Sequence, residues 1–324
     1  MHRIIAIVMA EGSAQATKQV FEPKNFESAP HYLGDSVPRQ YIVKREGDVL
    51  IKTYPPNVLV VKIERTVGNI FSKEGFLLRE MMIEEAKKIL KKRGANMKMS
   101  EEYALAVVDG YEGDPDLIVD EHRSQIAGFL KSEEQPLDDG EITHTLSTQM
   151  KYGKDDLLIL DWDGAIVFDA AGEVDSVLQV LELANLQLLQ YRILDDDLDH
   201  RLRRVEKLIR EKAGSKFFFW NREVSRAMRE VIRLRATSIV EFDALVRQIK
   251  LIGDWYSARL FELAGKKFRL DEWRISIKDK LDSLEDVYAI VAGNFSINKQ
   301  YFVEFLLQLG WLSLLLVELF QIFR

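Results

Sequence analysis

The distribution of proline divides this chain into two parts. All seven prolines lie at or before Pro136, and residues 137–324 contain none. Proline removes a backbone donor and clashes with the preceding turn of a helix, so a long stretch without it can form long helices. We therefore expect an α+β domain over residues 1–170, long helices over residues 171–293 and a separate C-terminal segment over residues 299–324.

Alternating apolar and polar runs in the first part predict β-strands. These runs cover residues 3–9, 41–45, 49–54, 58–67, 103–108 and 142–150. Helical periodicity predicts helices over residues 71–93 and 116–131, while the three prolines between residues 22 and 39 predict an irregular loop. The short strands and tight turns are typical of a mainly antiparallel sheet with helices.

The run LLILDWDGAIVFD, residues 157–169, predicts a β-hairpin that ends this sheet. Asp163–Gly164 between two apolar runs is a strong hairpin signal, because a type I′ turn requires positive φ at its central residues. The run also imitates the first motif of the haloacid-dehalogenase-like phosphatases, in which both aspartates are catalytic. One alternative function is therefore a metal-dependent phosphoesterase that uses Asp161 and Asp163, although Ala165 and the mid-chain position depart from that motif.

A heptad pattern begins at Val174 and continues to Ile209, with apolar residues spaced alternately by three and four. Such a pattern is typical of coiled coils. A return helix over residues 221–264 and a third helix over residues 271–291 complete the predicted long helical hairpin. We expect copies of the chain to associate along a seam formed by Leu188, Tyr191, Leu198, Leu202, Val205 and Ile209.

The last stretch, residues 301–323, contains no Lys, Arg, Asp or Pro. At about 1.5 Å per residue it is long enough to cross a hydrocarbon core of about 30 Å. Its polar residues Glu304, Gln308 and Glu318 fall on one helical stripe, as in a membrane span that packs against protein on one side. We predict a transmembrane anchor here, with a soluble helix that closes a bundle as the alternative.

Residues 201–235 hold twelve basic residues against four glutamates, in a chain whose net charge is -7. Basic groups beside aromatic rings suit a membrane surface, where each Lys or Arg contributes about 1 kcal/mol, and they also suit RNA. A solvated hairpin tip is the simpler alternative. The predicted membrane or RNA contacts are Arg201, Arg203, Arg204, Lys207, Arg210, Lys216, Phe217, Phe218, Phe219, Trp220 and Arg222.

The sequence contains no pattern that identifies a chemical reaction. The absence of cysteine excludes disulfides and thiolate chemistry, and no catalytic triad, phosphate-binding loop or dinucleotide fingerprint is present. Asp195, Asp196 and Asp199 match the spacing of a magnesium motif on one helical face, but a charge-rich helix explains them as well. We therefore predict a protein that is not an enzyme, with no catalytic residues, no cofactor and no small-molecule substrate.

Several runs resemble the "required for meiotic nuclear division" family, a domain of unknown function. They are DLLILDWDGAIVFD, VLQVLELANLQLLQYRILDDDLD, the FFFW step, DEWRISIKDKLDSLEDVY and the apolar terminal helix, over residues 156–324. The resemblance implies a membrane-anchored, self-associating protein without established catalytic activity, which in mitochondria supports organellar translation and so suggests RNA or the ribosome as a partner.

No mitochondrial presequence or secretory signal is visible, so we expect a membrane location with the folded domain on the cytoplasmic side. Together these observations predict a scaffold. An ion channel or transporter of CorA-like architecture is an alternative, because that family also places long helices before its membrane segments. It has two spans joined by Gly-Met-Asn, however, whereas this chain has one apolar segment preceded by Gly-Asn-Phe.

Overall fold

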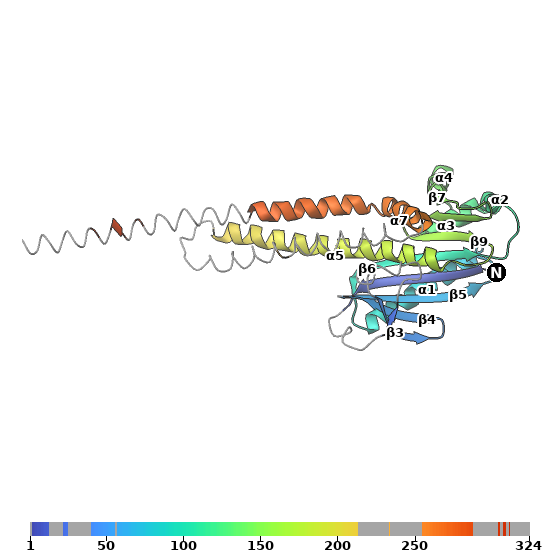
Figure 1. Cartoon of the computed structure of the whole chain (residues 1–324), viewed down its shortest axis with the longest axis horizontal. Coiled ribbons are helices and arrows are strands. Elements are labelled where there is room, and N and C mark those ends of the chain that lie inside the picture. Colours follow the sequence, from blue (N-terminus) through green and yellow to red (C-terminus); the bar gives the residue numbers. More distant parts are fainter. Residues whose placement is uncertain are drawn as a thin grey trace, which may run out of the picture. The chain divides into compact units, whose positions relative to one another are not determined.

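The computed structural model describes residues 2–12, 22–24, 40–55, 57–212, 233, 255–287, 304, 307, 308 and 311 (Figure 1). The chain divides into two compact units. The first comprises Met1–Asp196 and Phe242–Ile275, and the second comprises Asp197–Glu241 and Ser276–Arg324.

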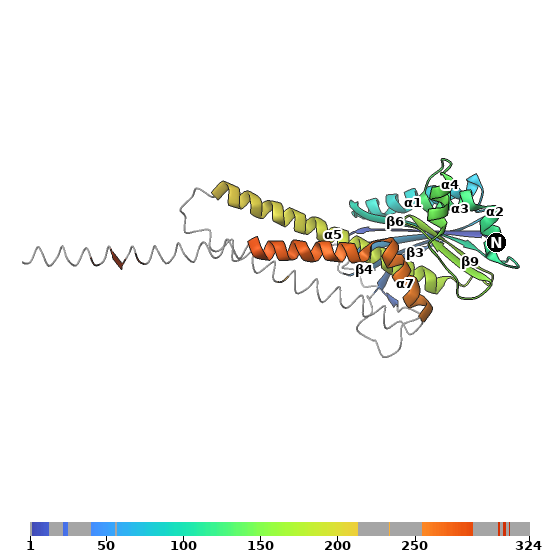
Figure 2. The same cartoon turned by 90° about the horizontal axis from the view of Figure 1, so that it is seen from above.

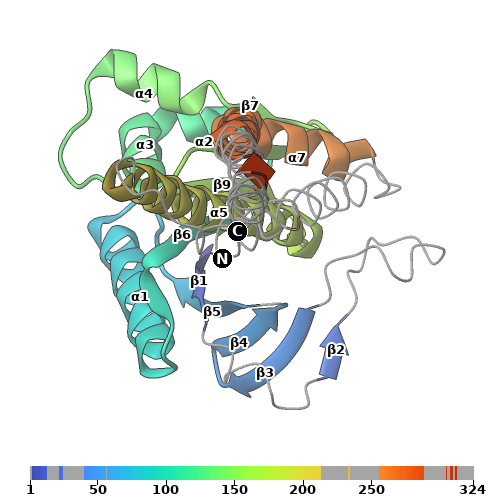
Figure 3. The same ribbon diagram turned by 90° about the vertical axis from the view of Figure 1, so that its left-hand side faces the viewer.

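One sheet forms the centre of the first unit. In the described part of the chain it has nine strands, in the order β2-β3-β4-β5-β1-β6-β9-β8-β7. The strands are β1 (His2–Glu11), β2 (Glu22–Lys24), β3 (Gln40–Glu46), β4 (Val49–Tyr54), β5 (Val58–Val67), β6 (Asn96–Val108), β7 (Gln149–Met150), β8 (Asp156–Leu160) and β9 (Gly164–Asp169). Figure 3 shows β1 inside the sheet, with β5 and β6 on either side. The predicted combination of a sheet with helices is confirmed.

Neighbouring strands are antiparallel with one exception, the pair β6 and β9. The predicted strands at 49–54 and 58–67 coincide with β4 and β5. The turn between β3 and β4 contains Gly47 at a φ of 58°, a conformation that glycine adopts without steric cost.

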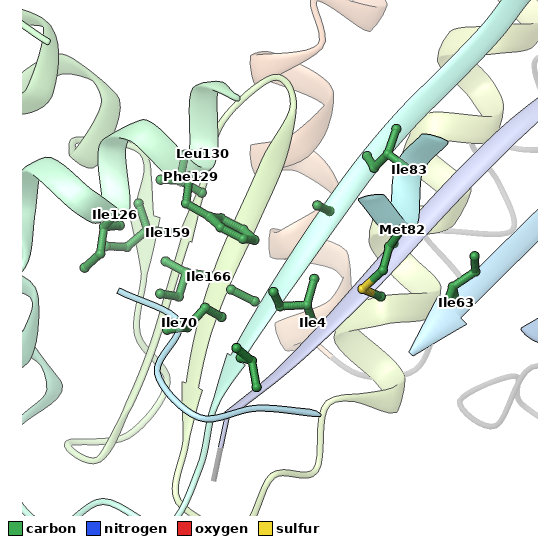
Figure 4. Packing of buried hydrophobic residues seen from close by; sticks show 14 of the residues in the cluster. Ile4, Ile63, Ile70, Met82, Ile83, Ile126, Phe129, Leu130, Ile159 and Ile166 are labelled. Carbon is green, nitrogen blue, oxygen red and sulfur yellow. The ribbon is translucent and has the colours of Figure 1, made fainter. Parts of the chain in front are cut away.

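Helices α1 (Lys73–Lys92) and α3 (Arg123–Lys131) cover one face of the sheet (Figure 2). α1 begins at Ser72, whose side chain accepts a hydrogen bond from the backbone N–H of Gly75. Apolar side chains from both helices meet the central strands in a single core, shown in Figure 4. The labelled members are Ile4, Ile63, Ile70, Met82, Ile83, Ile126, Phe129, Leu130, Ile159 and Ile166.

Helix α5 (Asp175–Lys212) begins on the opposite face of the sheet, on the side where α7 (Trp255–Lys267) also lies (Figure 2). Successive strand residues point to opposite faces. Ile51 of β4 belongs to the core under α1, whereas the next residue, Lys52, contacts Glu182 of α5. Further along α5, Arg192 pairs with Glu101 of β6. The sheet is therefore buried on both faces.

Three secondary-structure predictions in the first unit are wrong. Residues 142–150 were expected to form a strand, but most of them belong to helix α4 (Asp139–Leu146), and only β7 is extended. The β-branched run ITHT suggested a strand, yet Asp138 caps a helix by accepting from the N–H of Gly140. The predicted single helix over 116–131 is two helices, α2 (Pro115–Glu121) and α3, which meet at His122.

The third wrong prediction concerns residues 22–39, because the expected irregular loop begins with strand β2, paired with β3. Residues 25–39 lie outside the described part of the chain.

In the second unit, α5 runs beside a helix formed by residues 276–287, which continues from residue 270. Lys280 Nζ lies 2.6 Å from a carboxylate oxygen of Asp199. The apolar residues Leu198, Ile277 and Leu284 are fully buried. Of the predicted return helix over 221–264, the described portion consists of Arg233 and the first ten residues of α7.

No helix within the described residues combines the length and hydropathy that a membrane crossing requires. The predicted anchor over residues 301–323 lies almost entirely outside them. Its described members, Glu304, Leu307, Gln308 and Trp311, are helical and exposed.

Candidate functional site: a charged cluster at the β8–β9 turn

The turn between β8 and β9 consists of Asp161, Trp162 and Asp163. The backbone N–H of Asp161 donates to the carbonyl of Gly164 at 2.8 Å, which closes the turn. The backbone N–H of Ala104 on β6 donates to the carbonyl of Asp163, and the Tyr103 hydroxyl donates to the carbonyl of Asp161. The turn is therefore fixed against the neighbouring strand through its backbone.

The carboxylate of Asp161 is buried, with 2 % of the residue exposed. Its Oδ1 accepts from the N–H of Trp162 at 2.7 Å and lies 2.8 Å from Nζ of Lys267 on α7. Its Oδ2 lies 3.6 Å from Nζ of Lys131 at the end of α3 and has no hydrogen-bond partner. Two lysines from opposite sides of the sheet thus neutralise one buried carboxylate.

A third cation, Arg79, approaches the turn from α1. Its Nη2 donates to the carbonyl of Asp163 at 2.9 Å, and its Nη1 donates to Oγ of Ser132 and to Glu80. Burial raises the pKa of Asp163, and the nearby carboxylates raise it further, although Arg79 and Lys131 oppose this rise. Asp161 and Asp163 are therefore held differently, because Asp161 has two ammonium partners close to its carboxylate.

The aromatic ring of Phe268 packs edge to face against Tyr103 and Trp162, with ring centroids 5.7 and 5.9 Å apart. Phe268 follows α7 directly and is fully buried. The next residue, Arg269, has a φ of 55°, which is unusual for a residue with a Cβ atom. Together with the Lys267 ion pair, these contacts attach the end of α7 to the turn.

The reason predicted for Gly164 is wrong. Neither Asp163 nor Gly164 is among the positive-φ residues of the described chain, so a type I′ turn does not explain the glycine. A Cβ atom at position 164 would instead lie 2.8 Å from the carbonyl oxygen of Ala104. Glycine is required here because β6 and β9 approach closely.

We expect Gly164→Ala to lower the free energy of unfolding by about 1–3 kcal/mol, the usual cost of forcing extra volume into a packed site. Gly68→Ala is the matched control, because a Cβ atom there has open space around it. Urea denaturation of both variants measures the effect. Equal stabilities of the two variants would contradict the close approach of β6 and β9.

The geometry of the cluster is that of a clamp. A carboxylate nucleophile must reach its substrate, but Asp161 is buried and its Oδ1 is already bonded to Trp162 and Lys267. Within the described residues, no group of three His, Asp or Glu side chains is placed to hold a metal ion. The contacts join α1, α3, α7 and β6 at one turn.

Four of the predicted membrane or RNA contacts have described side chains. Nε of Arg201 donates to Asp197 at 2.7 Å, while Arg203, Arg204 and Lys207 are exposed. Arg210 lies in α5, but its side chain is outside the described set. Also outside it are Lys216, Phe217, Phe218, Phe219, Trp220 and Arg222.

The aspartates Asp195, Asp196 and Asp199 all lie in α5. Asp199 forms its ion pair with Lys280. A charge-paired helix surface therefore accounts for at least this member of the motif.

The predicted oligomer seam is divided by the structure. Leu188, Tyr191 and Leu198 are buried within the chain itself, which leaves them no surface to offer a second copy. Leu202 is half-buried. The side chains of Val205 and Ile209 lie outside the described set, so a seam at these later positions stays a prediction.

Sequence reasoning missed Arg79, Lys131 and Lys267. The two lysines end helices, where positive charge is ordinary. Arg79 did leave a signal, because it falls on the buried stripe of α1 with Gly75, Met82, Ile83, Ala86 and Leu90. A charged residue on a buried helix face implies a partner.

A further buried polar cluster lies between β4 and α5. Nζ of Lys52 donates to Glu182 at 2.7 Å and to Gln40 at 3.2 Å, and the Tyr54 hydroxyl donates to Glu182 at 2.5 Å. Burial raises the pKa of Tyr54 well above its usual value, and the charge of Glu182 adds to this. The cluster fixes α5 on the sheet.

Comparisons with known proteins find similarity without an assigned activity. Residues 42–175 match a family described as "Uncharacterized protein MJ0711, N-terminal domain". The chain is also similar to "Uncharacterized protein MJ0711" of Methanocaldococcus jannaschii, with 29% identity over 281 residues, which covers 86% of this chain and 82% of that protein. No solved structure matches. The family match runs from β3 to the first residue of α5 and includes the clamped turn.

Proposed function

We propose that this protein is a non-enzymatic, membrane-anchored scaffold in which residues 301–323 hold the chain at the bilayer and the long helices bring copies together. The observation that carries the proposal is the exposure of apolar side chains in this terminal stretch. Leu307 is 61% exposed and Trp311 is 70% exposed. Two exposed apolar side chains one turn apart suit contact with lipid or a partner, and tryptophan favours the membrane interface.

The alternative is a terminal helix that closes a soluble bundle. A closing helix buries one stripe against its own chain. Positions 304, 308 and 311 form one stripe and all three are exposed, as is position 307 on its flank. Because this face carries Glu304 and Gln308, we propose that it packs against a protein partner while the opposite face of the span meets lipid.

The length and repeat of α5 support the proposed self-association. α5 is 38 residues long, about 57 Å at 1.5 Å per residue. Its heptad pattern continues past the residues that the chain itself buries, so Leu202, Val205 and Ile209 are proposed to meet a second copy. We further propose that the predicted helical hairpin is completed by residues 221–254.

The basic aromatic tip, residues 201–222, is proposed to contact anionic lipid headgroups or RNA. The local excess of positive charge supports this, since residues 201–235 hold twelve basic residues against four glutamates and basic groups bind phosphates. The resemblance to the "required for meiotic nuclear division" family supports the anchor and the self-association in the same way. The folded units are proposed to face the cytoplasm.

Membrane fractionation tests the anchor. We expect the full chain to pellet with membranes, to resist high salt and to be released by detergent. Replacing Leu307 and Trp311 together by Lys should move the protein to the soluble fraction, because each charge within a span costs up to about 3 kcal/mol. Extraction of the unaltered chain by salt alone would remove the anchor from the proposal.

The matched control replaces Leu77 and Met81 by Lys. These two residues are also exposed and one turn apart, but they lie on α1 in the first unit. We expect this variant to remain with the membranes. Loss of both variants from the pellet would indicate a general effect of charge and not an anchor at residues 301–323.

A further inference from the structure

The second unit carries opposite charges on two neighbouring helices. On α5, Arg203, Arg204 and Lys207 are exposed, and we call them the basic face. On the helix over residues 276–287, Asp279 and Asp286 are exposed and stand on one side, seven residues apart, and we call them the acidic face. Arg204, Asp279 and Asp286 form no ion pair with any described residue.

The two helices run in the same direction. The charges of Asp271 and Arg274 act on the pKa of Tyr191, and further along both helices Lys280 pairs with Asp199. Asp286 lies six residues beyond Lys280. Because the helices are parallel, it is level with the residue six beyond Asp199, which is position 205. Asp286 therefore lies at the height of the basic face, while Asp279 lies about level with position 198, nearer the first unit.

We propose that a second copy of this chain docks its acidic face onto the basic face of the first copy. This inference rests on the self-association that is part of the proposed function. Copies anchored by their C-terminal tails in one membrane run parallel, so equal heights bring Asp286 of one copy close to Arg204 and Lys207 of the next. Such charge pairs set partner choice and register more than affinity.

The docking assigns different partners to different parts of the basic stretch. Arg203, Arg204 and Lys207 contact a second copy, and the basic and aromatic residues from Arg210 to Arg222 are left for lipid or RNA. It also places Leu202, which is half-buried within the chain, beside the charged contact. The apolar seam would then correspond to the core positions of a coiled coil, and the charge pairs to the positions that flank this core.

Charge reversal followed by mixing tests the docking. One full-length variant carries Arg203→Glu, Arg204→Glu and Lys207→Glu, and a second carries Asp279→Lys and Asp286→Lys. The assembly of each variant in detergent is measured by native mass spectrometry over a dilution series. Glu112→Lys with Glu121→Lys is the control, because both glutamates are exposed and lie in the first unit.

We expect each reversed variant alone to dissociate at a concentration at least about tenfold higher than the unaltered chain, because like charges then meet. An equimolar mixture should restore assembly, in particles that contain both variants. The control should assemble as the unaltered chain does. Restoration by mixing also shows that both variants are folded.

Two results overturn the docking. Either each reversed variant assembles as tightly as the unaltered chain, or the two variants lose assembly and the mixture does not recover it. In both cases the unaltered chain still assembles, so the self-association of the proposed function stands. A monomeric unaltered chain would instead remove self-association itself, and with it the docking.

Discussion

Glu182→Ala is expected to lower the free energy of unfolding by about 3–5 kcal/mol, the usual cost of removing one partner from a buried ion pair. The Lys52 ammonium, 8% of whose side chain is exposed, would lose its carboxylate partner. The Tyr54 hydroxyl would lose the nearer of its two acceptors, at 2.5 Å, and keep Gln40 at 3.3 Å. Urea denaturation gives the magnitude, and faster hydrogen exchange in β4 gives the location.

The matched comparison removes both charges. Lys52→Met combined with Glu182→Leu should cost much less than Glu182→Ala, because replacing a buried ion pair by apolar groups is often close to neutral. Gln40 would still lose its contact with Lys52, and Tyr54 its contact with Glu182, so we do not expect a gain in stability. If the double variant proved as unstable as Glu182→Ala, packing at this position and not the buried charge would explain the loss.

Asp161→Asn is expected to lower the free energy of unfolding by about 2–4 kcal/mol, while Asp163→Asn should leave it unchanged or raise it. An amide at position 161 leaves Lys267 and Lys131 without their shared carboxylate. Burial raises the pKa of Asp163, so its charged form is the costly one and a neutral amide removes that cost. Urea denaturation of both variants at neutral pH measures the contrast.

The pH dependence gives an independent check of Asp163. Because its pKa is raised on folding, the folded chain holds this proton more tightly than the unfolded chain. The stabilising contribution of the protonated group is present below 3.8, the ordinary pKa of an aspartate, and is lost as the pH rises through the higher folded pKa. The stability of Asp163→Asn relative to the unaltered chain should therefore increase over that window. A decrease would show that Asp163 is stabilised in its charged form.

The strands of the first unit could be predicted because their signals are local. Alternation predicted β4 and β5, and the glycine in the Glu46–Asp48 turn marked the connection between β3 and β4. The helix α5 was also predictable from its repeat. The prediction of a strand over residues 142–150 was wrong. The β-branched residues suggested a strand, but the spacing of Ile142, Thr145 and Leu146 was helical.

The sequence predicted the position of the clamped turn but not the contacts that it makes. Asp163–Gly164 predicted a hairpin. The glycine is required, however, because the backbone of Ala104 on β6 lies too close for a side chain, and this is a contact between distant parts of the chain. Lys131, Lys267 and Arg79 come from three helices, and nothing in their local sequence shows that they converge. The same holds for Lys52 and Glu182, which lie 130 residues apart.

The most direct test of the anchor is the environment of position 315 in the presence of lipid. The chain has no cysteine, so Leu315→Cys provides a single site for an environment-sensitive fluorophore, and Glu121→Cys on α2 provides the control. In vesicles containing anionic lipid, we predict a blue-shifted label at position 315 that is quenched by bromine-labelled lipid and protected from iodide. The label at position 121 should be quenched by iodide alone. Equal quenching of both labels by iodide, with none by the lipid, would contradict the account.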